Sequence, residues 1–235
     1  MFTRTLKRLL LAASMCCLVA TANAAPFDDA VAAYDRGDYA QALKMFRQLA
    51  TKGNAVAQFN LGLMYANGRG VSQDDEEAVR WYKLAAAQGY ADAQFNLGVM
   101  YSKGLGVTQD YQEALKWYRL AAAQGHAFSQ NNIGGMYLRG DGVTQNHQEA
   151  AKWYRLAAAQ GNALAQNSIG IMYAVGQGVI QDYASAHMWF NLSSASGNAD
   201  GAKNRDVTAK EMTPQQIEKA QEMARKCQER NFKGC

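Results

Sequence analysis

The sequence predicts an all-α solenoid, a stack of similar two-helix units, and three observations lead to this fold class. Four tryptophans stand 36 residues apart: Trp81, Trp117, Trp153 and Trp189. Several series of glycines keep the same step, among them Gly62, Gly98, Gly134 and Gly170. Between these markers, apolar residues recur at helical spacing. A period of this length is typical of stacked units that share one continuous core.

Four full repeats fit this period, and they are numbered one to four below. They are residues 55–90, 91–126, 127–162 and 163–198. Residues 25–54 keep part of the pattern and lack the Gly-x-Gly-Val loop, so we expect them to form an N-terminal cap unit. Residues 199–235 depart from the pattern, and we expect them to form C-terminal capping helices.

Each repeat is expected to contain two helices. In repeat one, the first helix covers about residues 55–67, and Gly68 ends it as a C-terminal cap. The second helix starts after Asp74, a residue type that favours N-caps, and Glu77 three residues later completes a capping-box pattern. The mid-helix Gly62 costs about 1 kcal/mol relative to alanine. Its recurrence in every repeat predicts that a large side chain of the second helix presses against the backbone there.

The first 24 residues are interpreted as a secretory signal peptide. Arg4, Lys7 and Arg8 precede a short apolar stretch, and Ala22–Ala24 provides a small-x-small cleavage site, so we expect cleavage after Ala24. A membrane anchor or a lipoprotein signal is the alternative. Without this leader the chain is nearly neutral, which gives no sign of a basic nucleic-acid-binding face. We expect a periplasmic or secreted protein without stable membrane insertion.

Two cysteines remain after the leader, Cys227 and Cys235. In an oxidising compartment such a pair predicts a disulfide that pins the C-terminal tail, with two free thiols as the alternative. No metal site and no cofactor are expected. Two thiolates are too few ligands, and His126, His147 and His187 are scattered without ligand spacing.

The pattern of the repeats closely resembles the Sel1-like repeat, a relative of the tetratricopeptide repeat. In repeat one it is carried by Ala57, Leu61, Gly62, Tyr65, Gly68, Gly70, Val71, Asp74, Ala78, Trp81, Ala85, Ala86 and Gly89. The resemblance covers about residues 27–198, and residues 27–54 look closer to a tetratricopeptide repeat. It implies a right-handed superhelix of antiparallel helix pairs, with the first helices along a concave face. It also implies an adaptor or scaffold role, often at the bacterial envelope.

The candidate partner-binding residues lie on the first helices. Asn60, Asn96, Asn132 and Ser168 occupy one equivalent position, and Phe59 and Phe95 precede two of them. An asparagine side chain both donates and accepts hydrogen bonds, so a row of them suits the backbone of an extended peptide. The asparagines could instead be structural, and the phenylalanines could pack between repeats. Other positions on the same side of the first helices carry a different residue in every repeat. They form either a neutral surface or a groove that is specific for one partner.

These observations favour a non-catalytic envelope scaffold that binds a protein or peptide segment in the concave groove. Three alternatives are a regulator that sequesters a periplasmic sensor or assembly factor, a binder of cell-wall glycan or peptide, and a β-lactamase-like hydrolase. The hydrolase alternative is implied by a resemblance to cysteine-rich relatives of this repeat family, which carry a cysteine pair in each repeat. This chain lacks those pairs and has no Ser-x-x-Lys after the leader, so no catalytic residue is predicted.

Overall fold

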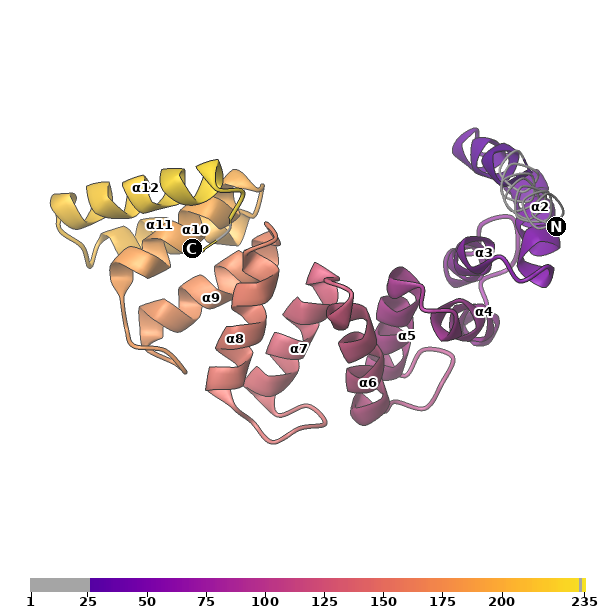
Figure 1. Ribbon diagram of the computed structural model, residues 1–235, viewed down its shortest axis with the longest axis horizontal. Helices are drawn as coiled ribbons and strands as arrows, with labels where there is room; N and C mark the ends of the chain where they lie inside the picture. The colour runs from indigo at the N-terminus through magenta and orange to yellow at the C-terminus, as the bar shows by residue number, and fades with distance from the viewer. Residues whose placement is uncertain (1–25, 233) are drawn as a thin grey trace, which may run out of the picture. The chain divides into compact units, whose positions relative to one another are not determined.

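The computed structural model describes residues 26–232 and 234–235, and these residues form helices, turns and loops with no strand among them. The prediction of an all-α solenoid is confirmed, because consecutive helices pack against each other in pairs (Figure 1). The signal peptide of residues 1–24 and its cleavage site lie outside the described residues.

Residues 26–35 are helical and precede eleven helices with defined bounds. These helices are α2 (Tyr39–Thr51), α3 (Ala55–Asn67), α4 (Asp75–Ala87), α5 (Ala91–Lys103), α6 (Tyr111–Ala123), α7 (Ala127–Arg139), α8 (His147–Ala158), α9 (Ala163–Val175), α10 (Tyr183–Ala195), α11 (Ala199–Ala209) and α12 (Pro214–Glu229). In repeat one, both bounds of the first helix match the expected residues.

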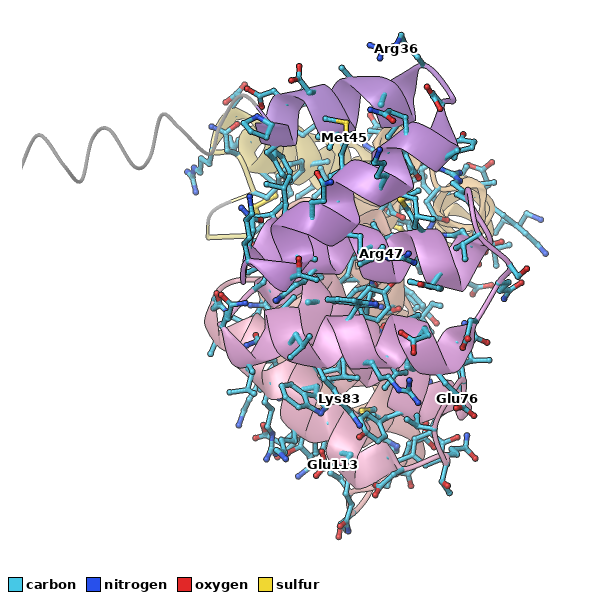
Figure 2. The ribbon with its side chains drawn as sticks, turned by 90° about the vertical axis from the view of Figure 1, so that its right-hand side faces the viewer. Arg36, Met45, Arg47, Glu76, Lys83 and Glu113 are labelled. Carbon is cyan, nitrogen blue, oxygen red and sulfur yellow. A yellow bond between two sulfur atoms is a disulfide. The ribbon has the colours of Figure 1, made fainter. Side chains whose placement is uncertain are left out.

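The helices belong to two compact parts. The N-terminal part contains the described residues up to Ala93 together with Leu105–Val107, and the C-terminal part contains Gln94–Gly104 and Thr108–Cys235. The core of the N-terminal part is built around Phe46, Leu61 and Met64. Figure 2 shows Arg47 on the surface of this part, where its guanidinium donates a 2.7 Å hydrogen bond to the hydroxyl of Tyr65.

The ends of the helices follow the predicted caps with one correction. Gly68 ends α3 in the left-handed conformation, with φ at 63°. Asp74 caps α4 by accepting a hydrogen bond from the backbone N–H of Glu77. The expected reciprocal bond from Glu77 is not made, because the N–H of Asp74 donates to the carbonyl of Tyr65 at 3.0 Å. Glu77 instead forms an ion pair with Arg80.

The mid-helix glycines touch an aromatic ring, as predicted. A Cβ atom added to Gly62 would lie 2.6 Å from the ring of Tyr82, and one added to Gly134 would lie 2.8 Å from the ring of Tyr154. In repeat four, Phe190 takes the place of tyrosine against Gly170. These rings are buried, whereas Trp81 beside Tyr82 is only half-buried. The glycine therefore sets the distance between the two helices of a repeat.

The second glycine of each loop has a role that its conformation alone did not predict. A Cβ atom on Gly142 would lie 2.7 Å from Tyr111, the first residue of α6. A Cβ atom on Gly178 would likewise lie 2.3 Å from the carbonyl oxygen of His147, at the start of α8. The loop of one repeat therefore rests on the backbone at the start of the preceding second helix, and only glycine leaves room for it.

Buried glutamines provide a second link between repeats. The side chain of Gln130 donates to the carbonyl of Ala122 in the preceding repeat at 3.3 Å, and its oxygen accepts from Gln160 at 2.7 Å. Gln58 makes the same two bonds, with Ala50 and Gln88. Because buried polar groups are costly when unpaired, these bonds also fix the register between repeats.

The C-terminal end closes the stack. Thr213 and Gln216 form a full capping box at the start of α12. This helix packs on α10, and its residues Ala224 and Cys227 join a buried cluster that includes Leu192 (Figure 1). Leu156, the equivalent of Leu192 in the preceding repeat, is half exposed. The sulfur atoms of Cys227 and Cys235 lie at bonding distance, with their Cα atoms 5.6 Å apart.

The contact between glycine and tyrosine predicts opposite effects at two adjacent residues. Gly134→Ala should lower the free energy of unfolding by about 1–2 kcal/mol, because overpacking against Tyr154 outweighs the gain in helix propensity. Gly135→Ala is the matched control. Its added Cβ would first meet the flexible end of Arg139, at 3.1 Å. Urea denaturation should show the control at least as stable as the parent, and equal losses in both variants would contradict this account.

A second prediction concerns His187, which is buried on α10 with no hydrogen-bond partner for Nδ1 among the described residues. Burial lowers its pKa, the charge of Arg205 lowers it further, and Asp206 acts in the opposite direction. The unfolded chain therefore takes up this proton more readily than the folded one. The stabilisation is present above the ordinary histidine pKa of about 6.5 and is lost as the pH falls through it.

The matched variant is His187→Leu, since Leu115 occupies the equivalent position in repeat two. Urea midpoints measured from pH 8 to pH 5 should fall less steeply for the variant than for the parent protein. Identical slopes would show that the imidazole does not contribute to the acid sensitivity.

Candidate functional site

The predicted polar site residues Asn60, Asn96, Asn132 and Ser168 belong to one side of the first helices, which we call the first-helix face. Four equivalent positions form it in each repeat. They are Val56, Asn60, Leu63 and Asn67 on α3; Asp92, Asn96, Val99 and Lys103 on α5; Phe128, Asn132, Gly135 and Arg139 on α7; and Leu164, Ser168, Ile171 and Val175 on α9. The packing positions repeat almost unchanged, whereas most positions of this face differ from repeat to repeat.

The predicted polar residues of this face are half-buried, and their contacts differ between repeats. Asn60 donates to the carbonyl of Val56 in its own helix at 2.8 Å. Asn132 and Ser168 lie near the hydroxyls of Tyr118 and Tyr154, where each lowers the pKa of the phenol. Each of these tyrosines belongs to the preceding repeat. The asparagine row is thus partly engaged in the scaffold, through tyrosine hydroxyls and not through the neighbouring loop.

Phe59 and Phe95 are half-buried and lie among other rings. The ring centroid of Phe59 is 5.1 Å from that of Tyr90, and the centroid of Phe95 is 4.8 Å from that of His126. Such distances are typical of favourable aromatic pairs. Both phenylalanines therefore have a packing role, and each leaves part of its ring accessible.

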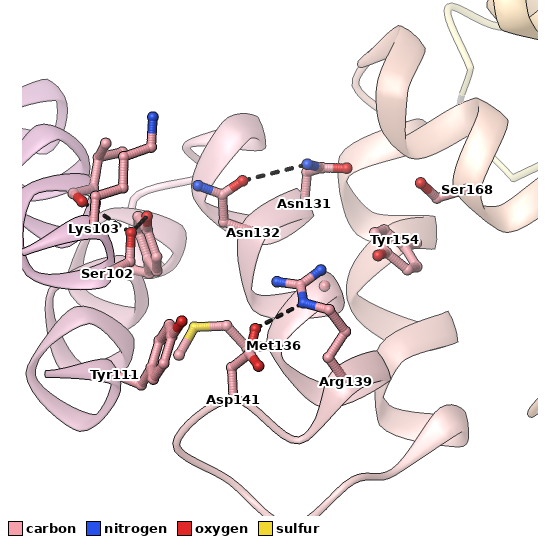
Figure 3. A pocket seen from close by; sticks show the side chains of 13 residues that line it. Ser102, Lys103, Tyr111, Asn131, Asn132, Met136, Arg139, Asp141, Tyr154 and Ser168 are labelled. Atoms are coloured by element: carbon pink, nitrogen blue, oxygen red, sulfur yellow. Dashed lines mark hydrogen bonds and ion pairs between the residues drawn. The ribbon is translucent and has the colours of Figure 1, made fainter. Parts of the chain in front are cut away.

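A pocket of about 370 Å³ opens on the first-helix face of the C-terminal part. Its lining comes from α5, the start of α6, α7, α8 and α9, and it includes the predicted residues Asn132 and Ser168. Figure 3 shows Lys103 on one side of the pocket and Arg139 on the other. Arg139 uses Nε to form a 2.7 Å ion pair with Asp141.

Two tyrosines reach the pocket from the second helices. Tyr118 and Tyr154 are buried, and burial raises the pKa of each phenol. Hydrogen bonds from Ser102 and Asn132 oppose this rise at Tyr118, and Ser168 with Arg139 opposes it at Tyr154. Both phenols therefore stay protonated at neutral pH and can donate a hydrogen bond.

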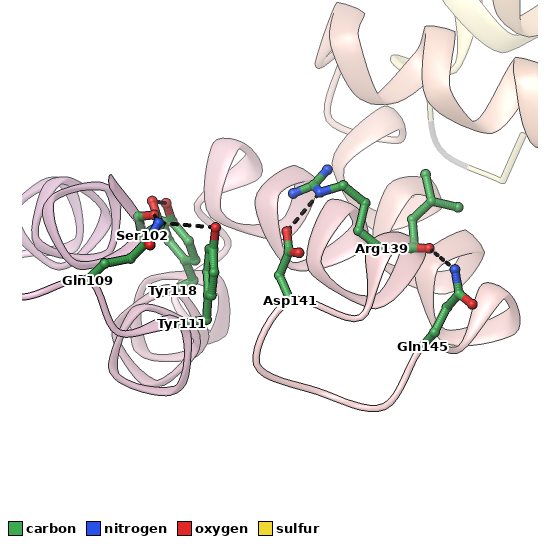
Figure 4. Close-up of polar contacts among 8 residues, drawn as sticks. Ser102, Gln109, Tyr111, Tyr118, Arg139, Asp141 and Gln145 are labelled. Carbon is green, nitrogen blue, oxygen red and sulfur yellow. Dashed lines mark hydrogen bonds and ion pairs between the residues drawn. The ribbon is translucent and has the colours of Figure 1, made fainter. Parts of the chain in front are cut away.

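The wall of the pocket is held by backbone-directed contacts. Gln109 donates to the carbonyl of Ser102 at 2.8 Å and to the hydroxyl of Tyr111 at 3.1 Å (Figure 4). Gln145 makes the equivalent bond to the carbonyl of Leu138 at 2.7 Å. Each loop is thereby tied to the end of the helix that precedes it, so the pocket is shaped before any partner arrives.

Apolar side chains on the same face are exposed. Phe128 is 54% exposed, Leu164 55% and Val175 61%. Phe128 and Leu164 occupy the first turns of α7 and α9, and Val175 ends α9. Exposed apolar residues of this size, on the same helices as residues that line a polar pocket, are typical of surfaces that bind a peptide or protein.

The other groups considered for chemistry are explained by the scaffold. His147 contacts the side chain of Gln177, and His187 faces Arg205 and Asp206 across α10 and α11. Within residues 26–232 and 234–235, no group of three histidine, cysteine or acidic side chains is placed to hold a metal ion. Trp189 is buried, and Trp81, Trp117 and Trp153 are half-buried.

Gly135 and Asn131 are two of the lining residues of the pocket that sequence reasoning did not single out. Gly135 follows the mid-helix Gly134 and was not singled out, although the other repeats carry Leu63, Val99 and Ile171 at its position. Asn131 stands in repeat three where repeats one and two carry Phe59 and Phe95, and it was not among the predicted site residues. Its side-chain oxygen is buried and accepts no hydrogen bond from the described residues. The comparison of equivalent positions in the four repeats covered other positions of the first helices and did not include the one that Gly135 occupies.

Comparison with known families agrees with this architecture. A family model described as the Sel1 repeat matches residues 33–54, 55–90, 91–126, 127–162 and 163–198. The chain belongs to the Sel1 repeat family. Proteins of this family mediate protein interactions, and their repeats generally serve as scaffolds. The match begins at residue 33, within the segment that was predicted to resemble a tetratricopeptide repeat.

Solved structures extend the comparison. A Sel1 repeat protein from Oxalobacter formigenes is 33% identical, with a TM-score of 0.74, and the match covers 87% of this chain and 83% of that one. The protective antigen c5321 from uropathogenic Escherichia coli is 31% identical, with a TM-score of 0.55, over 83% of this chain and 50% of that one. The immunity protein Pa5087 from Pseudomonas aeruginosa shares the fold at 18% identity, with a TM-score of 0.52 and coverage of 84% and 81%.

No curated protein sequence matches the chain. Among the residues that the structure describes, no helix combines the length and the apolar character that crossing a membrane requires.

Proposed function

We propose that this Sel1 repeat protein is a non-catalytic scaffold of the bacterial envelope that binds an extended segment of a partner protein on its first-helix face. One observation carries the proposal. Most positions of that face change from repeat to repeat, while the packing positions around them stay the same. A surface freed from stacking and lined by exposed apolar and polar groups is suited to a specific partner.

The chemistry of the face supports a peptide as the ligand. Asn132 and Asn131 carry amide groups that can pair with a peptide backbone, and Phe128 and Leu164 offer apolar contacts. The pocket that Asn131 and Asn132 line is held by scaffold hydrogen bonds. A face that is already ordered loses little conformational entropy on binding, so more of the interaction energy appears as affinity.

The alternatives find less support. Glycan binding would require exposed tryptophan faces, whereas the four tryptophans are buried or half-buried among the helices. A hydrolase would require a nucleophile beside a base, and the two histidines near carboxylates or amides have scaffold contacts. A regulator that sequesters a sensor or assembly factor would use the same face, so it is a special case of the proposal.

Site-specific crosslinking tests the proposal. A photo-crosslinking amino acid at Asn96, expressed in the native envelope, should give a protein adduct that mass spectrometry identifies. In a second protein the crosslinker is moved to Val99, and Asn60, Asn96 and Asn132 are changed to alanine. The adduct should disappear in this protein if the chain still folds. The control carries the crosslinker at Leu120, which is 44% exposed on α6. An adduct from Leu120 and none from Asn96 would move the partner site to the second helices.

The compartment is part of the proposal, because Cys227 and Cys235 are placed to form a disulfide that stays formed only where conditions are oxidising. Expressed with its own leader, the protein should appear in the periplasmic fraction, start at Ala25 and resist thiol alkylation until it is reduced. Cys235→Ser should lower the free energy of unfolding by about 2–3 kcal/mol. A chain that keeps residues 1–24 and two reactive thiols would contradict the assignment.

A further inference from the structure

One position of the first-helix face differs in size from its equivalents. Repeats one, two and four carry Leu63, Val99 and Ile171 there, and repeat three carries Gly135. Gly135 lines the pocket of about 370 Å³. Its helix conformation does not require glycine, since it has no positive φ, and helix propensity disfavours it by about 1 kcal/mol. The pocket therefore lies at the position where repeat three has glycine and the other three repeats have a larger apolar side chain.

The charges around this pocket favour an anion. Lys103 and Arg139 stand at equivalent positions in repeats two and three, where repeats one and four have Asn67 and Val175. Among the described residues that line the pocket, Asp141 is the only acidic one, and it engages Nε of Arg139. The terminal nitrogens of the guanidinium are further donors. Figure 3 shows the guanidinium of Arg139 among the labelled side chains, between Asp141 and the two asparagines.

A hydrogen-bond acceptor in the pocket is also unused. The oxygen of Asn131 is buried and accepts no hydrogen bond from the described residues. Asn167, its equivalent in repeat four, accepts a 3.0 Å bond from Asn204. A buried polar atom left unpaired costs about 1–3 kcal/mol, so a turn of this amide toward a donor supplied by a ligand would be favoured. A peptide N–H next to an acidic side chain supplies such a donor.

We propose that the pocket around Gly135 receives an aspartate or glutamate side chain of the bound segment, with Lys103 and Arg139 as its positive partners. This inference rests on the proposed function and specifies its ligand. The tyrosine hydroxyls at Tyr118 and Tyr154 add neutral donors on the same side. Exposed Phe128 and Leu164 lie on the same helices, so the segment carries apolar residues beside the acidic one.

Peptide selection tests this proposal without a known partner. A phage library of random dodecapeptides is selected in parallel on the full chain, on Gly135→Val and on the control Ile171→Val. Gly135→Val restores the side chain of repeat two and fills the pocket, and the control changes the equivalent position where a large residue already stands. Melting curves, with Gly135→Ala as a milder second variant, establish that each protein is folded.

Peptides from the parent and the control should share an aspartate or glutamate at one position, and peptides from Gly135→Val should lack it. A synthetic amidated peptide should bind the parent at least about tenfold more weakly after Glu→Gln, and this difference should vanish in Gly135→Val and shrink in Lys103→Gln and Arg139→Gln.

The other outcomes separate the two proposals. Peptides that bind the first-helix face without an acidic position, or equally on Gly135→Val, would overturn the acidic pocket and leave the proposed function standing. A requirement for a free C-terminal carboxylate would overturn the assignment to a side chain. No enriched peptide on any of the three proteins would count against peptide binding itself, and the pocket inference would fall with it.

Discussion

The contact between a mid-helix glycine and an aromatic ring sets the geometry on which the other features depend. At Gly62, Gly98, Gly134 and Gly170 the ring of the second helix lies where a Cβ atom would be. The two helices of a repeat can therefore approach closely, and in repeats two and three the hydroxyl of the buried tyrosine lies near the first helix of the next repeat. In the C-terminal part, Asn132 and Ser168 meet that hydroxyl, so the same ring that closes one repeat also orients polar groups on the next.

Within one helix, this arrangement separates the stacking positions, which carry similar residues in every repeat, from the surface positions, which vary between repeats. On α7, Ile133, Gly134 and Met136 are buried, whereas Phe128 and Arg139 on the opposite side are exposed. Because a helix places residues three and four apart on one face, the stacking residues leave a separate stripe that stacking does not constrain. Residues can therefore change along that stripe without disturbing the stacking of the repeats, and the pocket beside Gly135 is one result.

The periodic features were predictable, because every repeat carries the same residue types at the same spacing. The bounds of the first helix of repeat one, the start of its second helix, the C-terminal cap at Gly68 and the close contact at Gly62 followed from spacing and residue type. The reciprocal capping box failed because the N–H of Asp74 already has a partner in Tyr65, a contact between helices that spacing does not reveal. The glutamine bonds and the pocket depend on side chains from two or three repeats meeting in space. Asn131 illustrates this, since only its neighbours show that its oxygen lacks a partner.

The junctions between repeats have a consequence for how such a protein can change its length. Gln58 and Gln130 bond to the preceding repeat in the same way, and the second loop glycine rests on the preceding helix in the same way each time. An in-frame duplication or loss of 36 codons would thus recreate a junction that already exists, while α12 would still cover only the last repeat. The number of binding positions on the protein can grow or shrink by recombination, with no new interface to evolve.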